Sequence, residues 1–360
     1  MLMVNNPGSW SYIYAPLRHA EWNGLTPTDL VFPFFMFIMG MSAYMSLRKY
    51  DFRPSWPVFW KIIRRTVILF AIGMGVVFFG RFVRGLSSGK DFWEILLNFN
   101  TIRILGVIPR LALCYGIGST IAILAGRRTL LVTVLLLIAY SVILLCGNGF
   151  EFADHNVIAV VDRAVLGTNH MYSDTVGGVT LKFDPEGFLS TLPSIAHTLI
   201  GFLAAKMIMT RDDNKDRIIS LMVMGTCLTF AGFLLSYGMP INKKIWSPTF
   251  VLTTCGLASL LLALLIWIID VKGWKQWTPF FRDFGVNPLF LYVLGTIFSI
   301  LLGVIKVGDK SLQGYIYRDL LVPVCDGNLT LASLTFALLF VGFNWIFAYI
   351  LYKNKIYIKI

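Results

Sequence analysis

Long apolar stretches separated by short polar connections dominate the chain. Nine of them reach the length of about 20 residues that a membrane-spanning helix needs. They lie at 29–48, 60–80, 104–125, 129–147, 191–210, 217–237, 247–269, 284–305 and 329–352. The pattern predicts an all-α fold, a polytopic transmembrane helix bundle with about nine full spans. Residues 1–4 are also apolar, and we interpret them as the remnant of a truncated first span.

The polar connections predict one domain, residues 1–360, with a small cap on one side. The longest connection, 148–190, is rich in Gly, Asn, Asp and His and is the segment expected to form this outer cap. Asp184-Pro-Glu-Gly187 near its end is typical of a turn that leads into the next helix.

The charges are distributed unequally between the two sides of the predicted bundle. The chain has a net charge of +12, with 57% hydrophobic and 14% charged residues. If alternate connections face the same side, one side and the C-terminal tail hold 18 Lys and Arg against six Asp and Glu. The positive-inside rule makes that side cytoplasmic and places the segment around His19 outside. The charge therefore indicates topology, and we expect no nucleic-acid partner.

The segment from Arg18 to Asp29 gathers polar groups at the mouth of the first apolar stretch. His19 could act as a general base, because an imidazole with a pKa of about 6.5 accepts a proton near neutral pH. It could equally be an interfacial histidine that hydrogen-bonds a loop. Asp29 could accept the Nδ1–H of His19 and fix its tautomer. Thr26, Pro27 and Asp29 also read as a helix cap, which explains the carboxylate as well.

Several further residues suit a sugar or an anionic ligand. Trp22 offers an aromatic face and Asn23 an amide, although tryptophan is also common at membrane interfaces. The candidate contacts for a substrate are Asn5, Asn6, Trp22, Asn23, Asn242, Lys243 and Trp246, the last three in a short basic loop on the otherwise neutral side.

A second set of polar residues falls at the ends of the spans. Arg110 lies about two turns inside an apolar stretch, where a charge costs roughly 2.5–3.5 kcal/mol, so it should face a cavity or snorkel to the interface. Asn287 begins a span on the inner side and could be a simple N-cap. Five cysteines without paired spacing indicate free thiols, and we expect no metal. Nucleotide-binding loops and the serine hydrolase elbow are absent from the sequence.

These motifs occur in the order of a known family. Asn5-Asn6-Pro-Gly, His19-Ala-Glu-Trp-Asn-Gly-Leu-Thr-Pro-Thr-Asp29, Arg103-Ile-Leu-Gly-Val-Ile-Pro-Arg110, Asp184-Pro-Glu-Gly187 and Asn242-Lys-Lys-Ile-Trp-Ser247 resemble the heparan-α-glucosaminide N-acetyltransferase family of transmembrane acyltransferases and its bacterial DUF5009 relatives. The resemblance covers essentially the whole chain. Two departures are the nearly missing first helix and the absence of the large lumenal domain of the animal enzyme.

The resemblance implies an enzyme that moves an acetyl group from cytoplasmic acetyl-CoA to the amine of a glucosamine-type sugar across the membrane. It implies that His19 is catalytic, as general base or acetyl carrier, and that Asp29 and Asn5 or Asn6 share its site. Acetyl-CoA is then the co-substrate, and an amino sugar or glycan, the lipid bilayer and a second copy of the chain are the expected partners. The candidate contacts for acetyl-CoA are Arg64, Arg65, Arg103, Arg110 and Asn287.

Two other classes of function stay open. An N-acetylglucosamine permease is one alternative, which broken helices and inverted repeats would favour, but no repeat is visible in the sequence. A structural subunit is the other, and the polar residues clustered at one end of the bundle argue against it.

Overall fold

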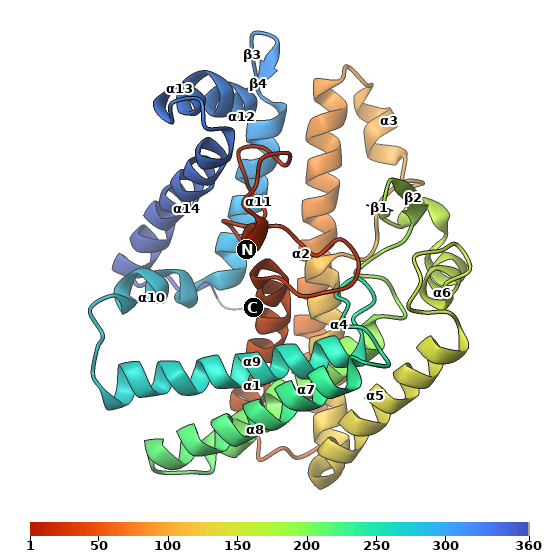
Figure 1. The fold of residues 1–360 in the computed structure, drawn as a ribbon, viewed down its shortest axis with the longest axis vertical. Coiled ribbons are helices and arrows are strands. Elements are labelled where there is room, and N and C mark those ends of the chain that lie inside the picture. The colour runs from red at the N-terminus through yellow and green to blue at the C-terminus, as the bar shows by residue number, and fades with distance from the viewer. Residues whose placement is uncertain (359–360) are drawn as a thin grey trace.

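The fold is a bundle of helices with two small hairpins (Figure 1). The computed structural model describes residues 1–358; Lys359, one of the basic residues counted above, lies outside this range. The helices are α1 Val31–Arg48, α2 Trp56–Ser87, α3 Phe92–Leu97, α4 Val107–Ala125, α5 Thr129–Cys146, α6 Val157–Leu166, α7 Thr191–Met209, α8 Asn214–Leu235, α9 Pro248–Ile266, α10 Thr278–Val286, α11 Pro288–Val304, α12 Leu312–Tyr315, α13 Val322–Val324 and α14 Leu329–Lys353. The strands are β1 Ser173–Val176, β2 Val179–Lys182, β3 Lys306–Val307 and β4 Lys310–Ser311.

The length and composition of the helices make this an integral, multi-pass membrane protein. Within residues 1–358, seven helical stretches are long and apolar enough to cross a membrane, or eight if α10 and α11 form one broken span. The bundle is therefore as expected, but the count of nine spans is not shown. Two places account for the difference. The predicted spans 104–125 and 129–147 correspond to α4 and α5, which join through one turn into a single stretch, Val107–Cys146. A bend of 86° between α10 and α11 falls near the start of the predicted span 284–305.

The bend follows from the sequence at Asn287-Pro288. Proline has no backbone N–H and clashes with the preceding turn, so it begins a new helix instead of continuing the old one. Asn287 has φ −130° and ψ 53°, which lies outside the helical region and turns the chain. Its side chain binds the C-terminal tail, donating from Nδ2 to the carbonyl of Ile356 (2.8 Å) and accepting from the amide of Ile358 (2.7 Å).

The centre of the bundle is the seam between α1 and α7, where two glycines let the backbones touch. A Cβ at Gly40 would lie 2.0 Å from the carbonyl oxygen of Thr198, and a Cβ at Gly201 would lie 2.1 Å from that of Phe37. Small residues at such crossings allow the close approach on which helix association in membranes depends. The seam fixes the start of α1, where Asp29 lies, relative to α7.

A second hydrophobic cluster supports the connection between α5 and α7. Tyr140, Leu144, Ile158 and Phe183 are fully buried there, and the Tyr140 hydroxyl donates to the carbonyl of Ile245 (2.6 Å). Beside it, β1 and β2 form an antiparallel hairpin in the register Ser173↔Lys182 and Val176↔Val179. The cluster and this hairpin lie next to the His19 segment and frame the candidate site.

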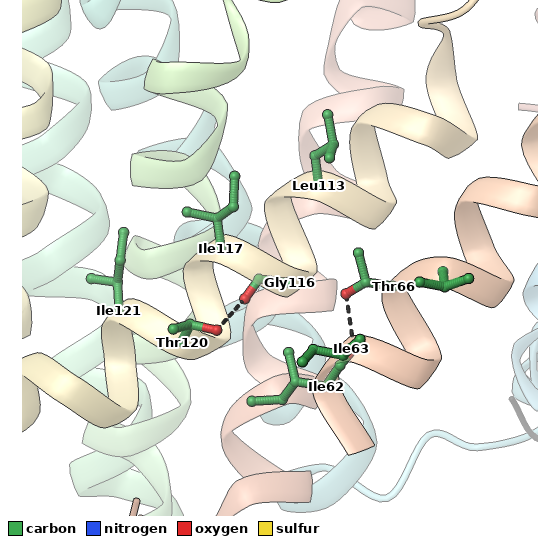
Figure 2. Close-up of a pocket in the computed structure, with 9 residues that line it drawn as sticks. Ile62, Ile63, Thr66, Leu113, Gly116, Ile117, Thr120 and Ile121 are labelled. Atoms are coloured by element: carbon green, nitrogen blue, oxygen red, sulfur yellow. Dashed lines mark hydrogen bonds between the residues drawn. The ribbon is translucent and has the colours of Figure 1, made fainter. Parts of the chain in front are cut away.

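The cavity between α2 and α4 is apolar (Figure 2). It measures about 310 Å³ and is lined by Ile62, Ile63, Thr66, Val67, Leu113, Gly116, Ile117, Thr120 and Ile121. Each lining hydroxyl is bound within its own helix: Thr66 donates to the carbonyl of Ile62 (2.9 Å) and Thr120 to that of Gly116 (2.8 Å). The lining therefore suits acyl chains and offers no free hydroxyl to a polar ligand.

Candidate active site

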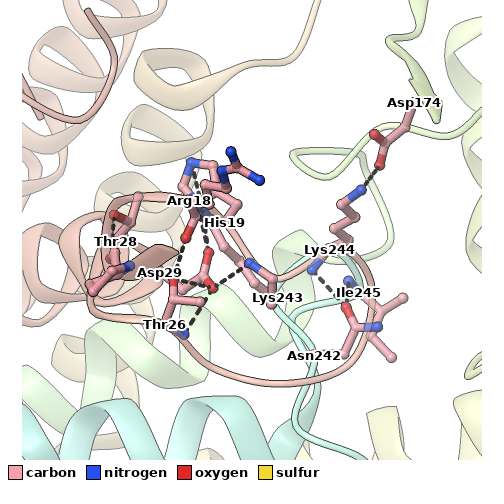
Figure 3. A network of polar contacts seen from close by, with 12 residues as sticks. Arg18, His19, Thr26, Thr28, Asp29, Asp174, Asn242, Lys243, Lys244 and Ile245 are labelled. Atoms are coloured by element: carbon pink, nitrogen blue, oxygen red, sulfur yellow. Dashed lines mark hydrogen bonds and ion pairs between the residues drawn. The ribbon is translucent and has the colours of Figure 1, made fainter. Parts of the chain in front are cut away.

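The segment before α1 folds back over the start of that helix (Figure 3). Pro27–Leu30 form a short 3₁₀ turn ahead of α1, and Thr26 caps it. The Oδ2 atom of Asp29 accepts hydrogen bonds from the Thr26 amide (3.1 Å), the Thr26 hydroxyl (2.9 Å) and the Ala20 amide (3.0 Å). The fully buried carboxylate is thus fixed by its own loop.

The other carboxylate oxygen of Asp29 orients His19. Its Oδ1 lies 2.6 Å from Nδ1 of the imidazole. Because a carboxylate accepts, the pairing assigns the proton to Nδ1 and leaves the lone pair of the imidazole on Nε2, 3.5 Å from Nζ of Lys243. The His19 side chain is 40% exposed, whereas that of Asp29 is 1% exposed. This arrangement has a base facing an accessible space and a buried carboxylate behind it, as a proton-transfer site requires.

Lys243 reaches the same pair from the connection between α8 and α9. Its Nζ lies 3.3 Å from Oδ1 of Asp29 and 3.0 Å from Nδ1 of His19. Burial lowers the pKa of the Lys243 ammonium, and the negative charge of Asp29 opposes that effect. Of the candidate substrate contacts, Lys243 is therefore the one that the structure brings directly to His19.

Asn242 and Trp246 support the Lys243 loop from within. Asn242 is fully buried, and its Oδ1 accepts from the amides of Lys244 (2.8 Å) and Ile245 (3.2 Å). Trp246 is 1% exposed and packs edge-on against Phe32 at 5.2 Å between ring centroids. Both side chains therefore shape the loop from within, and their contact with a substrate stays a prediction.

Trp22 is also engaged by the protein instead of presenting an open face. Its Nε1 donates to the carbonyl of Phe150 (2.8 Å), and its ring packs edge-on against Phe152 (5.1 Å) and Phe183 (5.4 Å). Asn23 beside it is exposed, with Oδ1 accepting from Asn242 Nδ2 at 3.1 Å. Asn23 therefore remains available to a ligand at the edge of the site, whereas the Trp22 ring anchors the loop.

Asn5 and Asn6 lie in a segment held by other parts of the chain. Asn6 is buried, and its side-chain Nδ2 donates to the carbonyl of Leu2 (2.8 Å). The backbone amide of Asn5 donates to the carbonyl of Met1 (3.0 Å). The residues that follow are fixed to α14, where the Ser9 amide donates to the Ser333 hydroxyl (3.1 Å). No hydrogen bond within residues 1–358 links either asparagine to His19.

The β1–β2 hairpin ties the two site loops together. Its turn amide at Gly177 donates to Oε1 of Glu21 (2.8 Å), next to His19. Asp174 of β1 forms an ion pair with Lys244 (2.7 Å), next to Lys243. Gly177 and Gly178 both have positive φ, 57° and 81°, which suits the tight turn. The hairpin therefore bridges the loops at the edge of the site.

A set of acidic residues that the motifs did not assign surrounds Arg103. The guanidinium of Arg103 pairs with Asp184 and Glu186, each at 2.5 Å. Burial alone would raise the pKa of the Glu186 carboxyl, but the charges of Arg103 and Arg110, with the hydrogen bond from Arg103, together hold that pKa below its usual value. The Asp184-Pro-Glu-Gly187 motif predicts a turn that leads into the next helix, and its partner Arg103 lies 81 residues away in the chain.

Arg110 fixes the far end of the same turn. It is fully buried, and its Nη2 donates to the carbonyl of Gly187 (2.9 Å) and to the Ser190 hydroxyl. Asp162 of α6 accepts from the Leu189 amide (2.9 Å) and leaves no room at Gly187, where a Cβ would lie 1.7 Å from its Oδ2. Arg103 and Arg110 thus both hold the 184–190 turn, at the His19 end of the bundle.

The other basic candidates lie apart from this group. Arg65 packs over the Tyr115 ring, with its guanidinium carbon 4.5 Å from the centroid. It lines a cavity of about 180 Å³ between α1, α2, α4 and α11 that also touches Pro288. Arg64 precedes it on α2, and Asn287 is occupied by the tail. The five residues expected to contact acetyl-CoA therefore do not form one cluster.

Comparison with known proteins relates the whole chain to one group of enzymes. The DUF5009 family, described as a domain of unknown function, matches residues 13–182. The Homo sapiens heparan-alpha-glucosaminide N-acetyltransferase is 27% identical over 414 residues, covering 100% of this chain and 58% of that protein. The Mus musculus protein of the same name is 25% identical, with the same coverage. The matches confirm the relationship inferred from the motifs, and the chain spans 58% of the length of these relatives.

Proposed function

We propose that this chain, a relative of the heparan-α-glucosaminide N-acetyltransferases and of the DUF5009 proteins, is a membrane-embedded acetyltransferase. The donor is acetyl-CoA, and the acceptor is the amine of a glucosamine-type sugar on the extracytoplasmic side. The observation that carries the proposal is the His19–Asp29 pair, with a 2.6 Å hydrogen bond from Nδ1 that leaves Nε2 as a base. The names of the two relatives supply the reaction type.

Acetyl transfer to an amine requires a base that accepts a proton from the attacking nitrogen. As the acceptor nitrogen forms its bond to the acetyl carbonyl carbon, Nε2 of His19 takes the proton from that nitrogen. The C–S bond of the thioester then breaks, and the imidazolium returns the proton to the leaving thiolate. The buried Asp29 carboxylate stabilises the imidazolium throughout. General base catalysis of this kind contributes typically about 10²–10⁴-fold.

A route for the donor is supported by the cavity beside Arg65. Its lining is largely apolar, and the Nε atom of Arg65 is buried without a partner in the described chain. An orphaned guanidinium nitrogen at the edge of an apolar passage suits a ligand that joins anionic groups to a slender, mostly uncharged arm. We propose that acetyl-CoA enters from this end, where the excess of basic residues lies, and reaches His19 from within the bundle.

The test is release of free CoA from acetyl-CoA by membranes that contain the protein, with a panel of glucosamine-terminated acceptors. The variant is His19→Ala, and the matched control is His155→Ala, an exposed histidine of the cap that pairs with Glu151 at 3.6 Å. We expect acceptor-dependent release that is lost in the first variant and kept in the second. Release that persists in His19→Ala would remove His19 from the reaction.

A second measurement separates the two roles of His19. Radiolabelled acetyl-CoA is mixed with the protein without acceptor and quenched within milliseconds. Label that stays on the wild-type protein and is absent from His19→Ala supports an acetyl-histidine intermediate. Absence of label, together with acceptor-dependent turnover, supports direct transfer.

The 86° bend between α10 and α11 favours one alternative, an amino-sugar permease, because broken helices are common in secondary transporters. A permease has no need of acetyl-CoA. Binding of acetyl-CoA to the purified protein, measured by calorimetry, therefore decides between the two functions.

A further inference from the structure

A second cavity, with a partly polar lining, lies between α2, α3 and α11, outside the His19 site. It measures about 800 Å³. Arg103 lies in its wall and is already neutralised by Asp184 and Glu186. Arg81, Arg84 and Lys90 also line it, and Glu94 is the acidic residue among its lining residues. The cavity therefore carries excess positive charge that the acetyl transfer proposed above does not use.

These cations lack partners in the protein. Within residues 1–358, Arg81, Arg84 and Lys90 form no ion pair at 4.0 Å or less, although other surface cations such as Lys310 do. The Nη1 atom of Arg81 is buried and makes no hydrogen bond in the described part of the chain. Burying a guanidinium nitrogen away from water without a hydrogen-bond partner costs free energy. An anionic ligand that accepts a hydrogen bond from this nitrogen removes that cost, and its binding is favoured accordingly.

The position of the cavity along α2 places these cations at the membrane surface. Between Arg65 and Arg81 the helix has no charged residue, and this stretch spans about 24 Å at 1.5 Å per residue. That is somewhat less than the hydrocarbon thickness of about 30 Å, so both ends lie near the headgroups. The exposed Trp93 and Leu97 of α3, which borders the cavity, mark the same interface, 62% and 69% exposed respectively.

The lining changes character along its depth. Toward the middle of α2 it is apolar, with Val76 and Val77, and toward the outer end of that helix it is basic, with Arg81 and Arg84. Facing α2, α11 contributes Thr296, Ser299 and Ile300. A free anion would match the basic half and leave the apolar half against water. An amphiphile with a phosphate head and acyl chains matches both halves.

We propose that this cavity binds the phosphate headgroup of an anionic phospholipid, with Arg81 and Arg84 as the phosphate contacts and the acyl chains between α2 and α11. The proposal does not depend on the acetyl transfer reaction. The site would hold the outer ends of α2 and α11 together through a lipid.

The test uses the full chain in nanodiscs of phosphatidylcholine that contain a small fraction of phosphatidylglycerol. Native mass spectrometry counts the phosphatidylglycerol molecules retained after the protein is released from the disc. We expect one tightly held molecule in the wild-type protein. Retention should fall at least about tenfold in Arg81→Gln/Arg84→Gln, since each interfacial cation contributes about 1 kcal/mol.

Two controls separate charge from folding and position. Arg81→Lys/Arg84→Lys keeps the charges and should keep most of the retention. Lys306→Gln removes an exposed cation of β3, just beyond the C-terminal end of α11 and outside the cavity lining, and should retain lipid as the wild type does. Equal retention in the wild type and the double glutamine variant would overturn the proposal.

A final arm distinguishes the lipid from a free phosphate. Glycerol 3-phosphate, which is the headgroup linkage without acyl chains, is added in large excess. We expect it to leave the retained phosphatidylglycerol in place. Displacement by glycerol 3-phosphate alone would mean that the cavity is a site for a soluble anion and would overturn the lipid assignment.

Discussion

Asp29 carries the strongest constraint at the scale of single residues. Its two oxygens have separate tasks: Oδ2 accepts three hydrogen bonds from the loop, and Oδ1 orients His19. Lys243 adds a positive charge 3.3 Å from Oδ1. The pair is therefore assembled before any substrate arrives, which keeps the reorganisation needed in the transition state small.

Replacement of Asp29 by Asn tests the orienting role. An amide can still cap the helix turn, so the fold should survive, but it can no longer stabilise an imidazolium and favours the wrong tautomer. We expect kcat for acetyl transfer to fall about 10²–10⁴-fold with a smaller change in KM. Asp154→Asn, an exposed carboxylate of the cap, serves as the control. An Asp29→Asn enzyme with wild-type kcat would contradict the role given to the carboxylate.

The second prediction at this scale concerns pH and Asp162. Burial raises the pKa of its carboxyl from 3.8 to about 6, because the single amide hydrogen bond from Leu189 does not compensate for lost solvation. A raised carboxyl pKa means that the folded state binds the proton more tightly than the unfolded state. The protonated Asp162 therefore stabilises the folded state at low pH. The free energy of unfolding falls by about 3 kcal/mol as the pH rises from about 4 to about 6.

Asp162→Asn should remove this dependence. Thermal unfolding in detergent should show a higher midpoint for the variant than for the wild type at pH 7.5 and similar midpoints at pH 4. Asp154→Asn, whose side chain is 72% exposed before substitution, should leave the midpoint nearly unchanged at both values. A midpoint of Asp162→Asn below that of the wild type at pH 7.5 would mean that the charge is compensated.

At the scale of elements, the α1–α7 seam positions the site. Gly40 and Gly201 bring the two backbones into contact. Asp29 lies in the turn just before α1, and α7 follows the 184–190 turn that Arg103 and Arg110 hold. A change in the crossing distance therefore moves both ends of the candidate site at once.

Gly40→Ala tests this seam. Its Cβ would meet the Thr198 carbonyl oxygen at 2.0 Å, so the helices must separate, at a cost of typically 1–3 kcal/mol. Gly75→Ala on α2 is the matched control, because a Cβ there meets nothing within 4 Å. The unfolding midpoint should fall in the first variant and not in the second. Equal unfolding midpoints in the two variants would show that α1 and α7 can separate without a loss of stability.

The sequence predicted the features whose partners lie nearby in the chain. His19 and Asp29 are ten residues apart, and a proline-led cap fixes the turn between them, so their pairing could be anticipated. Lys243 is 224 residues from His19. Its charge marks it as a candidate in the sequence, but the sequence does not show that it contacts His19 and Asp29. The packing of Trp22 against Phe183 depends on tertiary contacts of the same kind. The count of nine spans is not shown for local reasons, because hydropathy windows register neither the turn at Asn287 nor the junction between α4 and α5.

At the scale of the whole molecule, the two ends of the bundle differ in chemistry. The His19 end gathers Asp29, Asp162, Asp184 and Glu186, all of which engage donors or cations there. The opposite end, where α7 finishes and α8 begins, carries Lys206, Arg211, Lys215 and Arg217. This asymmetry supports the proposed orientation with the His19 end outside.

Cysteine labelling in intact cells tests the orientation. Val179→Cys lies on the exposed hairpin beside the site, and Asp212→Cys lies in the exposed connection between α7 and α8. A membrane-impermeant maleimide should label the first variant fully in intact cells and the second only after permeabilisation. The unchanged protein, with its five cysteines, gives the background. Labelling in the reverse order would place His19 in the cytoplasm.

The dual use of the Asp29 carboxylate has a consequence for how such a protein changes over generations. One oxygen of this carboxylate caps the first helix turn and the other orients the histidine. A substitution that removes both oxygens costs the chain its helix cap and its chemistry together, whereas asparagine keeps the cap and alters only the histidine. The outer cap, 148–190, shares no atom with this pair, and variation there can alter what approaches His19 while the histidine keeps its orientation.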